Sequence, residues 1–151
     1  MGDSPVAEFD VQVRMHVYGE IITSCRFPRI HDVARAVGTG ETTVRDAFRR
    51  MQDAHVLVLQ TDSDEILMAN PFSAVPTPFV VRVGSRSWWG NCIWDALGIA
   101  AMVGGDAVIT TACGDCNDAM QVGIEGGTVS GEGITHFSVP ANKWWDNIKF
   151  T

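Results

Sequence analysis

Cys92 and Asp95 are the residues of this chain whose types and spacing best suit catalysis. They lie in segment 88–97, which reads WWGNCIWDAL. A helix that begins here would place both side chains on one face, because residues three apart are neighbours on a helix. The free N–H groups and positive dipole end of a helix N-terminus lower the pKa of a thiol. The pattern predicts a thiolate nucleophile beside a carboxyl proton donor.

The residues around this pair suggest how its chemistry could be tuned. Trp88, Trp89 and Trp94 are expected to form an apolar wall around the thiol, and Gly90 would allow close approach. Loss of water raises the pKa of a carboxyl group, so Asp95 is expected to be kept protonated as an acid. The alternative is a buried helix cysteine with a carboxylate that only complements the helix dipole.

Cys113 and Cys116 form a second pair of thiols, in the tight turn CGDC. Two thiols at this spacing can grip one metal ion, but a tetrahedral zinc site needs two further ligands. The other cysteines and the four histidines show no paired spacing. A metal half-site, a redox pair and a turn with small buried thiols all remain open for this pair.

The first half of the chain has the order of a winged helix-turn-helix, with three helices followed by a β-hairpin. Apolar residues in the third helix recur at the spacing of one buried face. Three prolines then mark a linker. We expect a winged-helix-like lobe over residues 1–78, with helices at 9–25, 29–37 and 41–54, strands at 56–59 and 65–69, and the linker at 70–78.

The second half, residues 79–151, reads as several short strands with one longer helix. This composition predicts a mixed β-sheet lobe with a central helix, so that the whole chain is α+β. The expected strands are 79–83, 107–111, 119–124 and 135–139, with a strand starting at 148–151. The expected helices are 91–103 and a short one at 141–146.

Composition and charge exclude some classes of function. The 151 residues include 11 basic and 18 acidic ones, for a formal net charge of −7, which disfavours nucleic-acid binding. In a transcription regulator, Arg45 and Arg49 would contact DNA phosphates, and the acidic wing turn would face the same phosphates unfavourably. No signal peptide pattern and no membrane-length apolar run is present, which predicts a cytoplasmic protein with no membrane partner. Its four cysteines should then be reduced.

Two motifs and the order of parts resemble a known family. A helix start carries Cys-x-x-Asp-x-Leu at 92–97, and the segment ITTAC at 109–113 precedes a turn and a strand. Together with the two-lobe layout, which covers most of the chain, these features resemble the alkylmercury (organomercurial) lyases. The resemblance implies that Cys92 binds mercury as a thiolate. Asp95 would accept the thiol proton, deliver it to the departing carbon and help to hold the Hg(II) product.

The same resemblance implies further properties. The substrate would be a small organomercurial or another thiophilic molecule, no organic cofactor would be required, and external thiols would release the Hg(II). Cys113 would be structural, and the first lobe would be a cap. The family's second catalytic cysteine is expected on a strand just beyond a segment like 144–151. The lobe 79–151 is therefore expected to be incomplete, or to lack that thiol.

Two rival hypotheses follow from the residues themselves. One is a soft-metal sensor or carrier for Hg, Cu or Zn that uses Cys92, Cys113 and Cys116 without turnover. The other is a winged-helix transcription regulator. The sequence does not predict an oligomeric state.

Overall fold

Three helices open the part of the chain that this computed structural model describes, residues 5–149. They are α1 (Pro5–Ser24), α2 (Ile30–Val37) and α3 (Glu41–Asp53). Along α1, Val13, Val17 and Ile21 are fully buried at a spacing of four residues, so they form one apolar stripe that packs on the other two helices. No helix among residues 5–149 is long and apolar enough to cross a membrane.

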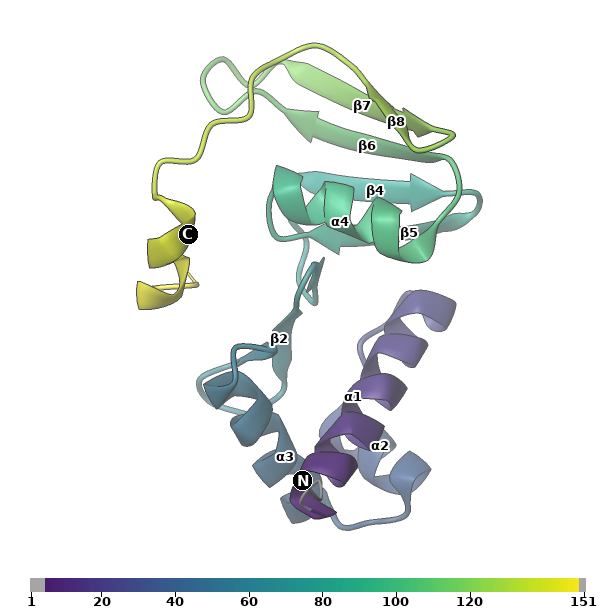
Figure 1. Cartoon of the computed structure of the whole chain (residues 1–151), viewed down its shortest axis with the longest axis vertical. Coiled ribbons are helices and arrows are strands. Elements are labelled where there is room, and N and C mark those ends of the chain that lie inside the picture. The colour runs from purple at the N-terminus through teal and green to yellow at the C-terminus, as the bar shows by residue number, and fades with distance from the viewer. Residues whose placement is uncertain (1–4, 150–151) are drawn as a thin grey trace.

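One antiparallel sheet follows the helices, and α4 (Ile93–Val103) packs on its β4 and β5 strands (Figure 1). The strand order is β1-β2-β3-β5-β4-β6-β7-β8, and every pairing is antiparallel. The α+β class is confirmed. The strands are β1 (Leu57–Leu59), β2 (Ile66–Ala69), β3 (Phe72–Ser73), β4 (Phe79–Val83), β5 (Arg86–Gly90), β6 (Ala107–Ala112), β7 (Ala119–Glu125) and β8 (Thr128–Ser130).

The sheet runs through both of the lobes that the sequence suggests. The expected linker at 70–78 contains β3, which pairs with β2 on one side and β5 on the other. The Trp88 indole N–H also donates to the Ile21 carbonyl at 2.7 Å, and the Arg86 guanidinium donates to the Ile22 carbonyl at 3.1 Å. Both bonds fasten the end of α1 to β5. The division into 1–78 and 79–151 stays a prediction.

Several expected elements differ in the structure. The strand expected at 135–139 is wrong, because residues 131–139 form no strand. Residues 135–138 are exposed, so packing against the core does not favour a strand there. Directly before them, Gly131 and Gly133 have φ values of +143° and +133°, far from the extended strand conformation. Strands β5 and β8 were not expected. The short helix at Ala141–Asp146 is present as a 3₁₀ helix, η1. Of the expected strand 148–151, residues 148–149 form a turn and 150–151 lie outside the described residues.

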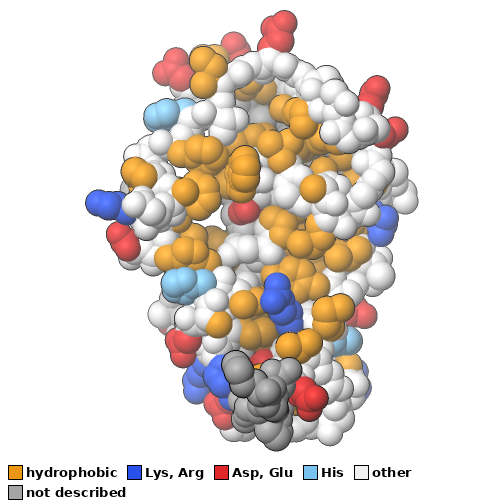
Figure 2. Space-filling model, in the orientation of Figure 1, with side chains coloured by type: hydrophobic (Ala, Val, Ile, Leu, Met, Phe, Trp, Pro, Cys, Tyr) orange, Lys and Arg blue, Asp and Glu red, His pale blue; other side chains and the backbone are white. Residues whose placement is uncertain are grey.

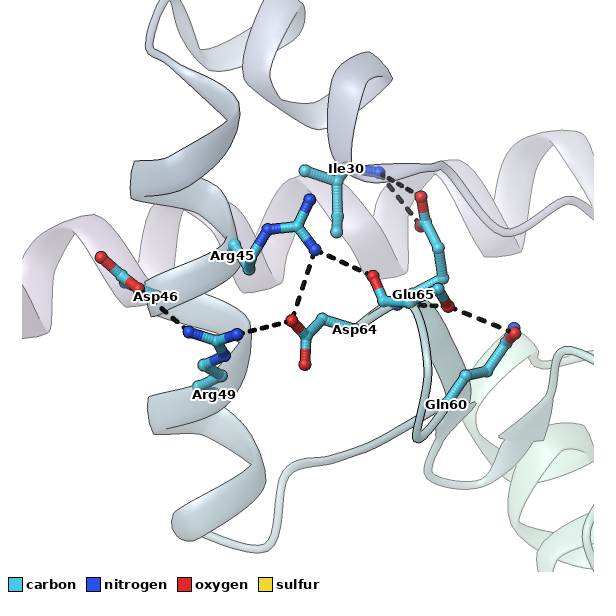
Figure 3. A network of polar contacts seen from close by, with 8 residues as sticks. Ile30, Arg45, Asp46, Arg49, Gln60, Asp64 and Glu65 are labelled. Carbon is cyan, nitrogen blue, oxygen red and sulfur yellow. Dashed lines mark hydrogen bonds and ion pairs between the residues drawn. The ribbon is translucent and has the colours of Figure 1, made fainter.

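Hydrogen bonds and ion pairs hold the turn between β1 and β2 against α2 and α3 (Figure 3). The Asp64 carboxylate accepts hydrogen bonds from Arg49 at 2.7 Å and from Arg45 at 3.3 Å. The Glu65 carboxylate accepts the N–H of Ile30, the first residue of α2, at 3.1 Å. Arg49 and Arg45 lower the pKa of Asp64. The two arginines expected to contact phosphates in a DNA-binding protein are thus paired with a carboxylate of the chain itself.

Candidate functional site

The start of α4 brings Cys92 and Asp95 together. Cys92 is the N-cap residue, with extended backbone angles, and its Sγ accepts the N–H of Asp95 at 3.5 Å. In return the Asp95 carboxylate interacts with the Cys92 side chain by a hydrogen bond. The Cys92 sulfur therefore caps the helix at the N–H of its third residue. The juxtaposition expected from the spacing is therefore present, with the thiol one position outside the helix.

Gly90 lets β5 run directly into this helix start. A Cβ on Gly90 would lie 2.8 Å from the backbone nitrogen of Ala96 and 3.0 Å from its Cα. No other residue type fits at that separation without moving the helix away from the strand. The close approach expected at Gly90 is confirmed, but its partner is the backbone of α4 and not the thiol.

Asn91 orients the carboxylate of the pair. Its Nδ2 donates to Asp95 Oδ2 at 3.0 Å, and it also lies 3.3 Å from both Asn70 Oδ1 and the Pro71 carbonyl. The Tyr18 hydroxyl donates to the Asn70 carbonyl at 2.8 Å. A continuous polar chain therefore runs from α1, through the segment before β3, to Asp95. Sequence reasoning missed Tyr18, Asn70 and Asn91, although an amide directly before Cys92 was a visible signal.

Burial sets the acidity of both groups. Loss of water raises the pKa of the Asp95 carboxyl, as expected, and the hydrogen bonds from Asn91 and Cys92 only partly oppose it. Burial also raises the pKa of the Cys92 thiol, and the nearby negative charge of Asp95 adds to the rise. The expected lowering of the Cys92 pKa at a helix N-terminus is therefore wrong. The hydrogen bond from the Asp95 N–H acts in the expected direction but is weaker than desolvation.

The tryptophans do not form the expected wall around the thiol. Trp88 is buried, whereas the next residue, Trp89, is 38% exposed and Trp94 is 62% exposed. Adjacent residues of a strand point to opposite faces, so Trp88 and Trp89 cannot both cover one site. The neighbours that the structure gives Asp95 and Asn91 are instead Tyr18, Asn70 and Pro71.

The face shown in Figure 2 carries hydrophobic side chains across its middle. Large exposed apolar residues of α4 include Trp94 and Met102. A cleft of about 1330 Å³ lies elsewhere, between α1–α2 and β4–β5, and its lining includes neither Cys92 nor Asp95. The pair thus lies outside this cleft.

Metal binding by the described residues is restricted to small donor sets. Within residues 5–149, no three or more His, Cys, Asp or Glu side chains lie close enough to hold one metal ion. Cys92 and Asp95 supply one sulfur and one carboxylate. Cys113 and Cys116 lie apart from them in the turn between β6 and β7. The three-thiol site of the sensor hypothesis is therefore not assembled in this part of the chain.

Comparison with known proteins agrees with this architecture. The alkylmercury lyase family model matches residues 72–151. No curated protein sequence matches the chain. The crystal structure of the mercury-bound form of MerB2 is similar, with a TM-score of 0.64 and 17% identity over 80% of this chain and 58% of that one.

The likeness to MerB2 shows a shared fold, and the chain spans less than two thirds of that protein's length. The family model covers more than half of the chain and includes the β5–α4 junction, where Cys92 and Asp95 lie. On this evidence the chain belongs to the alkylmercury lyase family.

Proposed function

We propose that this protein is an organomercurial lyase-like enzyme that cleaves a carbon–mercury bond by protonolysis, with Cys92 and Asp95 as its catalytic residues. The observation that carries the proposal is the contact of a soft sulfur donor with a carboxyl group at the start of α4, in a chain of this family. Mercury is a soft metal that prefers thiolate ligands. The substrate class is a small organomercurial or another thiophilic compound.

The first step is attack by sulfur. Cys92 rests as a thiol because burial raises its pKa. When its sulfur binds the mercury of R–Hg–X, the S–H proton passes to the Asp95 carboxylate and X⁻ leaves. A sulfur–mercury bond has formed, and Asp95 is now a carboxylic acid. The hydrogen bond between the two side chains provides the path for this proton.

The second step is protonation of carbon. The Asp95 carboxyl donates its proton to the carbon bound to mercury, a C–H bond forms as the C–Hg bond breaks, and RH leaves. A carboxyl pKa raised by burial suits a group that must both accept and donate a proton. Hg(II) is left between the Cys92 sulfur and the Asp95 carboxylate, while Asn91 holds that carboxylate in place.

Release requires other thiols. Two external thiols carry off the metal as Hg(SR)₂, and their protons return Cys92 to the thiol form and leave one proton for the solvent. No organic cofactor takes part in these steps. Dependence on small thiols fits a reducing compartment, so we propose a cytoplasmic location.

The test is release of benzene from phenylmercury acetate by the purified protein with excess small thiol. Benzene should form with the wild type and with Cys25→Ser, a matched loss of a thiol at the end of α1. It should fall to the uncatalysed level with Cys92→Ser and with Asp95→Asn. Benzene release by the wild type no faster than by Cys92→Ser would overturn the proposal. Stoichiometric mercury binding without benzene would assign the protein as a metal binder instead.

A further inference from the structure

The β6–β7 turn holds two thiols side by side. The Cys113 N–H donates to the Asp118 carbonyl at 2.8 Å, and the Asn117 N–H donates to the Cys113 carbonyl at 3.0 Å. Asn117 has a φ of +61°, which reverses the chain tightly. As a result the Cys116 thiol hydrogen-bonds to the Cys113 sulfur.

The two sulfurs differ in acidity. The N–H groups of Cys116 and Asp115 and the Cys116 thiol all point at the Cys113 sulfur and lower its pKa. At Cys116 the Asp118 N–H lowers the pKa, but the Asp118 carboxylate and the Cys113 sulfur together outweigh it and raise the pKa.

The exposure of the pair argues against a packing role. Cys113 is half-buried and Cys116 is exposed, and neither belongs to the buried core. The structural role that the family resemblance implied for Cys113 does not account for a second, solvent-facing thiol that is hydrogen-bonded to its sulfur. An ion in solution can reach both sulfurs directly.

The number of donors selects the kind of ion. In the described segment no third His, Cys, Asp or Glu side chain completes a metal cluster with these thiols. Structural zinc needs four protein ligands. Soft ions that accept two thiolates in a near-linear arrangement, Hg(II) above all, need only two, and thiolate is the ligand that they prefer.

The topology places this turn and the start of α4 at the same end of the sheet. β5 and β6 are each antiparallel to β4, so they run in the same direction and their C-terminal ends lie at one end of the sheet (Figure 1). Gly90 pairs with Phe79 and Thr110 with Val80, neighbouring positions of β4. Two strand spacings, about 10 Å, separate β5 from β6.

We propose that Cys113 and Cys116 form a second, independent binding site for Hg(II), which accepts the ion after it leaves Cys92. Binding converts two thiols and Hg²⁺ into a sulfur–mercury–sulfur bridge and two protons. The idea that the ion comes from Cys92 rests on the proposed lyase function. The binding site itself does not.

The experiment uses the Cys92→Ser protein, so that no lyase site is present, with HgCl₂ as the probe. Thiol titration and the ultraviolet sulfur–mercury absorption report the site, and gel filtration tests whether the complex is a monomer. One Hg(II) per chain should protect two thiols from modification. Replacing Cys113 or Cys116 by Ser in this background should abolish the protection, whereas Cys25→Ser should preserve it. Excess Zn(II) should not displace the mercury.

Undiminished protection of two thiols after Cys116 alone has been replaced, which leaves Cys25 and Cys113 in this background, would overturn the second site. So would full reactivity of Cys113 and Cys116 in the presence of Hg(II). Because the probe is inorganic mercury, these outcomes are independent of whether the wild type releases benzene from phenylmercury.

Discussion

Asn91→Ala isolates the hydrogen bond that orients the proposed proton donor. The substitution removes the amide that lies 3.0 Å from Asp95 Oδ2 and leaves a methyl group in its place. A hydrogen bond to a charged group contributes about 1.5–3 kcal/mol, and Asp95 is only half-buried, so we take the lower end of that range. One pKa unit corresponds to about 1.4 kcal/mol. The pKa of Asp95 should therefore rise by about one unit.

The assay is a carboxyl ¹³C NMR titration of protein labelled at aspartate, with Asp95→Asn used to assign the signal. Asn70→Ala is the matched control, because it removes an amide from the same polar chain that makes no direct bond to Asp95. The Asp95 pKa should move much less in that control. An unchanged or lowered Asp95 pKa in Asn91→Ala would refute the assigned role of the Asn91 amide.

The same shift predicts how stability depends on pH. The folded-state pKa of Asp95 lies above the ordinary value of an aspartate, because burial disfavours the charged carboxylate. Folding therefore favours the protonated form, and this contribution is fully present below the unfolded pKa and is lost as pH rises through the folded pKa. In Asn91→Ala the loss should extend to higher pH, and in Asp95→Asn it should be absent. Urea unfolding at a series of pH values measures both.

Three further predictions concern the framework, and urea unfolding checks each of them. Gly90→Ala places a methyl group against the backbone of α4 and should lower the free energy of unfolding by about 1–3 kcal/mol. The same change at Gly19, in α1 with open space around it, should raise the free energy of unfolding by about 0.5–1 kcal/mol. Equal effects of the two substitutions would contradict the close approach of Gly90 to α4. Trp88→Phe leaves a carbonyl of α1 without its donor and should cost about 1–3 kcal/mol, whereas the partly exposed Trp89→Phe should cost less than about 0.5 kcal/mol. Asp64, whose pKa is lowered by two arginines of α3, contributes stability that is present above its unfolded pKa and lost as pH falls through the folded pKa. Asp64→Asn should therefore reduce the loss of unfolding free energy at acidic pH. An unchanged dependence on acidic pH would show that the contacts of Asp64 with Arg45 and Arg49 contribute nothing to stability.

The sequence alone determined the features that depend on near neighbours. Cys92 and Asp95 meet because residues three apart at a helix start are brought together by the helix itself. The local sequence pattern predicted β4 with its observed bounds, and β6 and β7 to within one residue at their ends. β5 was missed because WWG before a cysteine looks like a helix entry, although Trp88 and Trp89 in fact alternate between the faces of a strand.

Only the tertiary structure decided the chemistry of the pair. Whether the Cys92 pKa rises or falls depends on how much water packing removes, and burial reversed the effect of the helix N-terminus. The bonds that reach Asp95 through Asn91 and Asn70 join residues 21 and 52 positions apart. A helix fixes its own neighbours by backbone hydrogen bonds, whereas desolvation and long-range contacts exist only once distant segments have packed.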